Sequence, residues 1–289
     1  MRLFAIAAAV LLTPFGAAAA ELPITIVAAE NFYGEVATAV GGDRARVENI
    51  LISPDADPHD FEPPPSVARA VADASIVVFN GADYDHWMEN LLESTERPER
   101  KVIEAAGLIG VKEGDNPHVW YDPRTMPAVA EALARALSEL DPEGAADYEA
   151  RRQAYVATLA PLDAKVGSIR QRFDGTAITA TEPVFGYMAD ALGLRMSNQD
   201  FQTAIMNETE PSAKDIAAVV DDIRDHKVKA LVYNTQVTDA MTEQLLGTAR
   251  EANVPVVGVT ETVPEGMSYA EWMTGQLESL EKALAGPSS

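Results

Sequence analysis

Short apolar runs rich in β-branched residues alternate along this chain with longer segments of helical periodicity. Consecutive parallel strands need a crossover, and a helix is the usual one, so the alternation predicts an α/β fold of parallel sheets covered by helices. Strands are expected at residues 24–28, 47–52, 75–79, 177–180, 230–233 and 254–259. Helices are expected at residues 30–40, 66–72, 85–92, 125–140, 184–192, 212–225, 239–251 and 269–284.

A long helical stretch separates two βα halves. Its apolar residues recur three, four or seven positions apart, which makes one stripe, and Pro161 is expected to kink it or divide it into two helices. Such a stretch joins two lobes stiffly. We therefore expect an N-terminal lobe at residues 21–143, a connecting helix at 144–173 and a C-terminal lobe at 174–289.

Residues 1–20 have the pattern of a secretory signal peptide. Arg2 is followed by an apolar run that ends in the small residues 18–20. Pro14 and Gly16 within the run argue against a membrane anchor. We expect the mature protein to begin at Glu21 and to be exported to a periplasm.

The composition narrows the function classes. Lys and Arg number 22 against 45 Asp and Glu, a formal charge of −23, and this acidity argues against nucleic acid as a partner. The chain has no cysteine, so disulfides, thiolate metal sites and an acylated cysteine are excluded. We expect a monomer that is neither lipid-anchored nor stably inserted in a membrane.

Two of the 4 histidines share an unusual context. His59 and His118 each follow Asp-Pro or Asn-Pro and lie in a loop bounded by a further proline. Proline fixes φ and keeps the preceding residue out of the helical region, so each imidazole sits on a stiff backbone. That suits a metal ligand, which then loses little entropy on binding.

Two carboxylates stand at comparable places in the second half. Glu182 and Glu261 each follow the end of a predicted strand by two residues. Ligands of open α/β sheets bind outside the carboxyl ends of the strands. The histidines of one half and the carboxylates of the other could therefore converge in the crevice between the lobes, where imidazole and carboxylate suit Zn, Mn or Fe.

The other two histidines have simpler interpretations. His226 lies among charged residues at a predicted helix end, where a solvated side chain favours the helix dipole. His86 precedes Trp87 at a predicted helix start, and we interpret it as mainly structural.

Four segments carry a family resemblance. DPHDFEP at residues 57–63 resembles the first metal motif of the metal-specific solute-binding proteins of ABC importers (cluster A-I, or cluster 9). NPHVWYDP at 116–123 resembles the second motif. EPVFGY at 182–187 is similar to the third and VTET at 259–262 to the fourth. The motif order is kept over nearly the whole mature chain.

The resemblance implies two Rossmann-like lobes joined by a long rigid helix, with one metal ion in the interlobe cleft. It implies that the protein is not an enzyme but delivers the ion to an ABC permease driven by its ATPase. Carried over residue by residue, the ligands are His59, His118, Glu182 and Glu261. The family usually has Asp at the fourth position, so Glu261 is a departure.

The third ligand position bears on the metal. Members with His there are zinc carriers, and members with Glu, like Glu182 here, carry manganese or iron. The resemblance therefore favours Mn²⁺, with Zn²⁺ as the alternative and Fe²⁺ as a further option. Oxygen-rich sites are relatively better for Mn²⁺, although Zn²⁺ binds most such sites more tightly in absolute terms.

A different class of function is a secreted metallohydrolase with Asp60 or Glu62 as general base. Catalytic zinc needs an open coordination position. Four convergent protein ligands leave little room for a substrate, and the sequence has no HExxH helix.

Overall fold

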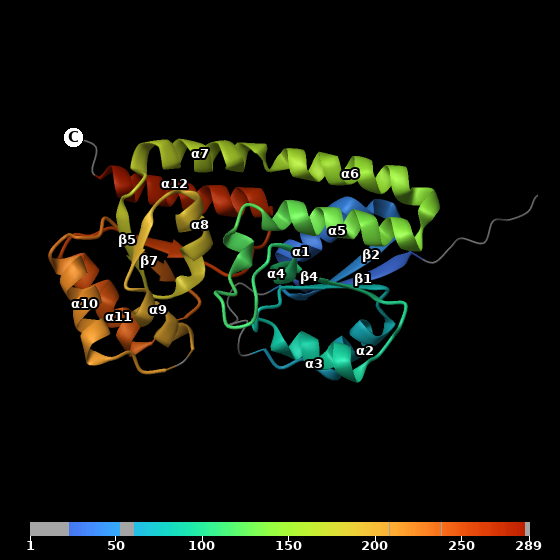
Figure 1. Cartoon of the computed structure of the whole chain (residues 1–289), viewed down its shortest axis with the longest axis horizontal. Helices are drawn as coiled ribbons and strands as arrows, with labels where there is room; N and C mark the ends of the chain where they lie inside the picture. Colours follow the sequence, from blue (N-terminus) through green and yellow to red (C-terminus); the bar gives the residue numbers. More distant parts are fainter. Residues whose placement is uncertain (1–22, 53–60, 208, 238, 287–289) are drawn as a thin grey trace, which may run out of the picture.

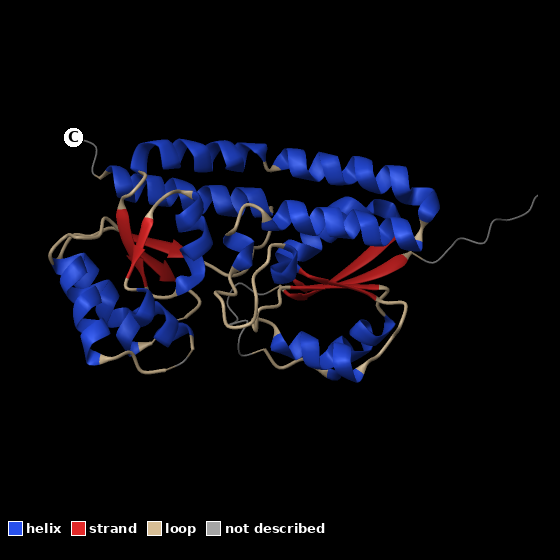
Figure 2. Cartoon of the chain, in the orientation of Figure 1, coloured by secondary structure: helices blue, strands red, loops and turns tan. Residues whose placement is uncertain are grey.

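A computed structural model describes residues 23–52, 61–207, 209–237 and 239–286. Within them the chain forms two α/β lobes, each built on its own parallel sheet, and loops gather between the two sheets (Figures 1 and 2). The predicted fold class is confirmed. None of the helices in the described ranges combines the length and the apolar character needed to cross a bilayer.

The N-terminal sheet has the strand order β2-β1-β3-β4. Its strands are β1 (Ile24–Glu30), β2 (Ala45–Leu51), β3 (Ile76–Phe79) and β4 (Lys101–Glu104). The helices and 3-10 turns of this lobe are α1 (Asn31–Gly41), η1 (Gly42–Arg44), α2 (Pro65–Asp73), α3 (His86–Ser94), α4 (Ala105–Leu108), η2 (Val119–Tyr121), α5 (Thr125–Leu140) and η3 (Pro142–Gly144). Helices α2 and α3 lie on one side of the sheet, and α1 and α5 on the other (Figure 1).

The C-terminal sheet repeats this topology with the order β6-β5-β7-β8. Its strands are β5 (Ala177–Ala180), β6 (Arg195–Ser197), β7 (Leu231–Asn234) and β8 (Val256–Val259). Its helices and turns are η4 (Pro183–Phe185), α8 (Gly186–Ala191), α9 (Gln199–Met206), α10 (Ala213–Arg224), α11 (Ala240–Glu251) and α12 (Tyr269–Ala285).

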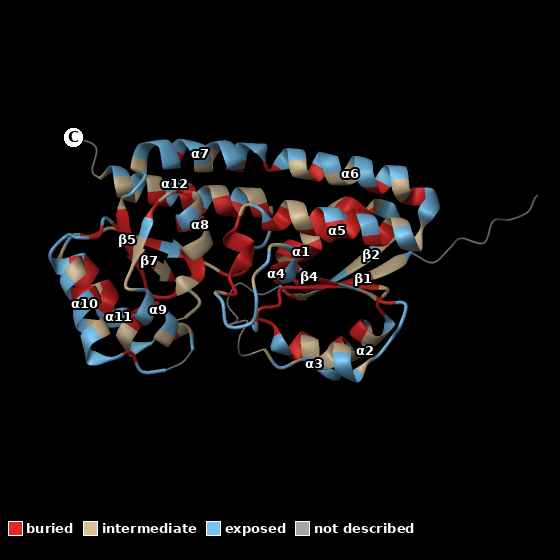
Figure 3. Ribbon diagram, viewed as in Figure 1, coloured by how far each residue is buried: buried red, intermediate tan, exposed pale blue. Residues whose placement is uncertain are grey.

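The connection between the sheets is two helices in line, α6 (Ala145–Thr158) and α7 (Ala160–Phe173). The division occurs next to Pro161, as predicted. Pro161 lies in the first turn of α7, where a backbone N–H has no helical carbonyl to donate to, so the missing N–H of proline costs no hydrogen bond there. Helix α6 packs on α1 and α5, and α7 packs on α12. The connection therefore runs along both lobes with its outer face exposed (Figure 3).

Some elements were missed or merged by the sequence patterns. Strands β4 and β6 are short and carry charged residues, and α4 and α9 are also short, so none of them has a clear period. The helix predicted at 184–192 is a 3-10 turn, η4, followed by α8.

The two sheets match in register as well as in order. Strand β3 pairs with β1 through Val77 and Val27, and β7 pairs with β5 through Leu231 and Thr179. Three residues further along, where each strand ends, the two sheets carry the same residue types at the corresponding positions. They are Glu30 and Asn80 in the N-terminal lobe, and Glu182 and Asn234 in the C-terminal lobe.

One aromatic core crosses from lobe to lobe. Phe32 of α1 lies 5.1 Å from Trp120 and 6.1 Å from Trp272 of α12, measured between ring centroids. Tyr121 lies 5.5 Å from Phe185 of the other lobe. All five side chains are buried in the same apolar cluster. This packing supports the loops at the carboxyl ends of the strands.

Candidate metal site

His118 is buried just before η2, with a relative exposure of 1%. Its loop is fastened to the end of β3, because Nδ2 of Asn80 donates to the carbonyl oxygen of Pro117 at 2.8 Å. The hydroxyl of Tyr33 donates to Oδ1 of Asn80 at 2.7 Å. The sheet of the N-terminal lobe thus fixes the backbone that carries the imidazole.

Asn116 fixes the tautomer of His118. Its Oδ1 accepts the backbone N–H of His118 at 3.2 Å and lies 2.7 Å from Nδ1 of the ring. Its Nδ2 donates to the carbonyl oxygen of Pro183 at 2.7 Å, so the oxygen is the atom that faces the ring. Because a carbonyl oxygen only accepts, Nδ1 carries the hydrogen. The lone pair of the neutral ring is then on Nε2, which is the form that binds a metal.

The two carboxylates come from the other lobe and share one amide. Glu182 lies two residues after β5 and Glu261 two residues after β8, and both are buried. Nδ2 of Asn234, the last residue of β7, donates to Oε2 of Glu182 at 2.7 Å and to Oε1 of Glu261 at 2.6 Å. The carboxyl ends of three parallel strands therefore bring these groups together.

His118 and Glu261 meet across the lobes. Nε2 of His118 lies 3.6 Å from Oε2 of Glu261. Two atoms that each bind one ion at about 2.1 Å can be no more than about 4.2 Å apart, so this pair has the separation of two ligands of a common metal. One neutral imidazole and two carboxylates also match the charge and the donor preference of a divalent transition metal.

Tyr84 also contacts Glu261. Its hydroxyl donates to Oε2 at 3.0 Å. Burial, followed by the charge of Glu261, raises the pKa of Tyr84 well above its usual value, so the hydroxyl keeps its hydrogen as a donor. The ring of Trp120 lies 4.7 Å from Tyr84 and 5.3 Å from His118, between centroids, and walls the site with apolar surface. A low-dielectric wall strengthens the attraction between carboxylates and a cation.

The structure thus brings together His118, Glu182 and Glu261, three of the four ligands implied by the resemblance. His59 lies outside the described residues, and its role stays a prediction. The signal peptide predicted at residues 1–20 lies outside them as well.

The remaining histidines lie at the surface. His86 begins α3 with a side chain that is 65% exposed, and its Nδ1 lies 3.1 Å from Glu89 and 3.7 Å from Asp83. These three side chains could approach one ion, but they are a solvated group at a helix start. His226 follows the end of α10 with a φ of +55°, and its place at a helix end agrees with the prediction from the sequence.

A second pair of carboxyl groups is enclosed in the N-terminal lobe. Glu30 and Asp85 are fully buried, and Asp85 accepts the backbone N–H groups of Asn80 at 2.6 Å and Gly81 at 2.8 Å. Burial, followed by the charge of Asp85, raises the pKa of Glu30 well above its usual value. Burial also raises the pKa of Asp85, to about 7. Each of these two buried carboxyl groups therefore keeps its proton to a higher pH than an exposed carboxyl group does.

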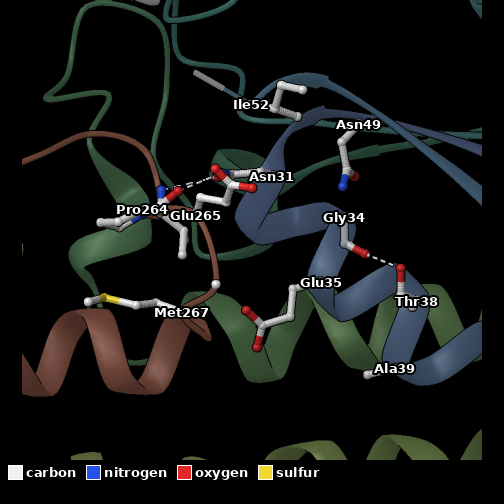
Figure 4. A pocket seen from close by; sticks show the side chains of 12 residues that line it. Asn31, Gly34, Glu35, Thr38, Ala39, Asn49, Ile52, Pro264, Glu265 and Met267 are labelled. Atoms are coloured by element: carbon white, nitrogen blue, oxygen red, sulfur yellow. Dashed lines mark hydrogen bonds between the residues drawn. The ribbon is translucent and has the colours of Figure 1, made fainter. Parts of the chain in front are cut away.

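A pocket lies elsewhere, between α1, the end of β2 and residues 263–267 (Figure 4). Its volume is about 810 Å³, and its described lining does not include His118, Glu182 or Glu261. Beside it, Nδ2 of Asn31 donates to the carbonyl oxygen of Val263 at 2.9 Å, and Oδ1 accepts the N–H of Val263 at 3.2 Å. This paired bond ties the lobes at the rim of their junction.

Sequence reasoning missed Asn234 and Tyr84, and it mentioned Asn116 only as part of a motif. Each makes a hydrogen bond that the local sequence does not announce. One feature of the sequence could have identified Asn234: it is a polar residue at the end of a buried strand, and such a residue lies at the carboxyl edge of the sheet. No such feature identifies Tyr84, which lies in a loop between β3 and α3.

Comparison with protein families gives one match over most of the chain. The profile of "ZnuA: Zinc-uptake complex component A periplasmic" matches residues 26–283.

Individual proteins of known name are similar at low identity. The manganese-binding lipoprotein MntA of Halalkalibacterium halodurans is 26% identical over 281 residues, which cover 91% of this chain and 89% of that protein. The iron-binding protein YfeA of Yersinia pestis is 27% identical over 220 residues, covering 73% of this chain and 69% of that protein.

Among solved structures, the periplasmic zinc-binding protein TroA of Treponema pallidum superposes with a TM-score of 0.76 at 20% identity, covering 91% of this chain and 99% of that one. This likeness shows the same two-lobed fold. The names of these three proteins refer to three different metals.

Proposed function

The chain belongs to the ZnuA family of periplasmic metal-uptake proteins, and from this premise we propose that it captures a divalent transition metal between its lobes and delivers it to the permease of an ABC importer. Membership of the family shows that the chain is a periplasmic metal-binding component of metal uptake. It is a substrate-binding protein and not an enzyme, so the metallohydrolase alternative is set aside.

The observation that carries the proposal is the meeting of His118 and Glu261 at 3.6 Å across the lobe junction, with Glu182 linked to Glu261 through Asn234. These groups are buried, and the two carboxylates carry charge into an apolar interior. Buried charges are stable only when paired, hydrogen-bonded or bound to a metal. A divalent ion is a suitable counter-charge for two carboxylates.

We propose His59, His118, Glu182 and Glu261 as the ligands. His118 is supported by its tautomer, and the two carboxylates by their common amide. His59 is supported by its sequence motif alone.

For the metal we propose Mn²⁺, with Zn²⁺ as the alternative within the same family. The support is Glu182, a hard oxygen ligand where zinc carriers of the family have His. The names of the similar proteins do not decide the metal, because they include manganese-binding, iron-binding and zinc-binding proteins.

We further propose that the protein is a monomer and is free in the periplasm. It works with a permease and an ATPase, and its lobes have the limits predicted from the sequence. Several relatives are named as lipoproteins. This chain has no cysteine to acylate, which supports the free form. Fractionation of cells after osmotic shock tests this part, because a free protein is released with the periplasmic contents.

The function is tested by deleting the gene and measuring import of Mn²⁺, Zn²⁺ and Fe²⁺ separately at limiting concentration. We expect manganese import to fall, and to be restored by the wild-type gene but not by one encoding His118→Ala. Normal import of all three metals would contradict the proposed function. A loss of zinc import alone would contradict only the manganese assignment.

A further inference from the structure

Asn234 is placed to control how the two carboxylates present themselves to a metal. The side chain is buried, with a relative exposure of 2%. Its Oδ1 accepts the backbone N–H of Gln236 at 3.1 Å, which turns the amide nitrogen toward Glu182 and Glu261. Both hydrogens of that nitrogen are then used, one on each carboxylate.

Each carboxylate therefore has one oxygen bound to Asn234 and the other directed elsewhere. For Glu182 the bound atom is Oε2, and for Glu261 it is Oε1. The other oxygen of Glu261, Oε2, is the one that lies 3.6 Å from Nε2 of His118. A carboxylate oxygen has two lone pairs, so Oε2 of Glu261 can bind a metal while it accepts a hydrogen bond from Tyr84. Chelation would also need the second oxygen to turn to the ion, and the hydrogen bond to Asn234 opposes this by fixing the direction of that oxygen.

We propose that Asn234 is a specificity-determining residue that restricts Glu182 and Glu261 to one metal-binding oxygen each. The inference rests on the proposed metal site and deepens it. Two single oxygens and two imidazoles make a four-coordinate site, which suits Zn²⁺, whereas Mn²⁺ prefers more oxygen ligands. Glu182 thus supplies an oxygen that favours Mn²⁺, and Asn234 limits how many such oxygens reach the ion.

The other lobe provides a matched control. Asn80 holds the corresponding register position, but its Nδ2 donates only to backbone carbonyls, those of Gly81 at 2.9 Å and Pro117 at 2.8 Å. It supports the loop of His118 and touches neither candidate carboxylate ligand. Removing the Asn80 side chain should therefore weaken the binding of both metals to the same extent, because the imidazole of His118 supplies one nitrogen ligand to either ion.

The experiment measures the dissociation constants of Mn²⁺ and Zn²⁺ by competition calorimetry for the wild type, Asn234→Ala and Asn80→Ala. We expect the ratio Kd(Mn)/Kd(Zn) to fall about tenfold in Asn234→Ala, a typical effect of a residue that orients a ligand, and to stay constant in Asn80→Ala. A constant ratio in Asn234→Ala, whether or not both affinities drop, would overturn the proposal.

A second measurement needs no variant. X-ray absorption of the wild-type protein loaded with Zn²⁺ should give about four nitrogen and oxygen neighbours at one distance. Five or six neighbours, as two chelating carboxylates produce, would overturn the inference. Wild-type protein that binds neither metal would refute the proposed function itself, and that outcome is distinct from both results above.

Discussion

The two lobes have the same sheet topology and the same pair of residue types at the carboxyl ends of their central strands, yet they use them differently. In the C-terminal lobe Asn234 donates to Glu182, which we propose as a metal ligand. In the N-terminal lobe Glu30 is fully buried, and burial and the charge of Asp85 raise its pKa well above the usual value. The strand position is therefore the same in both lobes, but the group beside the buried glutamate differs: an amide donor for Glu182 and a second carboxyl group for Glu30.

The lobes also differ in what they contribute to the junction. The N-terminal lobe supplies an imidazole whose tautomer is set by Asn116, and the C-terminal lobe supplies negative charge. Neither half alone is a metal site, because the imidazole lacks a counter-charge and the carboxylates lack nitrogen ligands. The paired bonds of Asn31 and the bond from Asn116 to Pro183 keep the halves in register.

The largest expected effect comes from removing a ligand of either lobe. His118→Ala and His59→Ala should each lower metal affinity by a factor on the order of a thousand, about 4 kcal/mol, while the fold is kept. Calorimetric titration and circular dichroism measure the two properties. His86→Ala is the matched control and should bind normally, since its side chain is exposed. Unchanged affinity in His118→Ala would contradict the proposed role of His118 as a ligand.

The next effect is on the stability of the whole protein, because the proposed ion would bind residues of both lobes. A ligand that binds only the folded state stabilises it by about 4 kcal/mol when its free concentration is a thousandfold above Kd. Thermal unfolding should shift upward by on the order of 10 °C with metal and return with chelator.

Acidification should also cancel the stabilisation by metal, because ligating imidazoles must be neutral. An unfolding curve that ignores both metal and chelator would contradict a site between the lobes.

A smaller effect is expected when the C-terminal ligand is made similar to the N-terminal ones. Glu182→His replaces a hard oxygen with an imidazole, so it should weaken Mn²⁺ by about tenfold and spare or strengthen Zn²⁺. Competition titrations with both ions give the ratio. Equal losses for the two ions would show that Glu182 acts on affinity and not on metal choice.

The smallest effect separates the two corresponding glutamates. In the unfolded chain the pKa values of Glu30 and Asp85 lie near 4.5 and 3.8, and in the folded protein both pKa values are raised. The two groups therefore hold more protons in the folded protein than in the unfolded chain. Their contribution to stability is therefore present at low pH and is lost as pH rises toward 7 and above. Glu30→Gln removes one of these ionisations, so it should raise the melting temperature by a few °C at pH 8 and leave it unchanged at pH 4.

The same substitution at the corresponding position should have a different result. Glu30→Gln should keep metal affinity, because a protonated glutamic acid and a glutamine are similar in shape and charge. Glu182→Gln should lose affinity, because a carboxylate ligand becomes neutral. If both variants bound metal equally well, the contrast between the lobes would not hold.

The sequence by itself determined the α/β class, most of the central strands and the break at Pro161. These depend on local periodicity and on the geometry of proline, which neighbours along the chain already specify. It also marked His118, Glu182 and Glu261, because stiff Pro-His loops and strand ends are visible in a single chain. Short edge elements such as β4 and β6 were missed, since three or four residues show no period.

Only the tertiary structure decided which polar groups meet. Asn234 is 52 residues from Glu182 and 27 from Glu261, and Tyr84 is 177 from Glu261. The register match between Glu30 and Glu182, and the burial of Glu30 beside Asp85, appear only in the folded structure. Parallel strands bring distant segments to one edge of a sheet, so the partners of each end residue depend on the packing of both lobes.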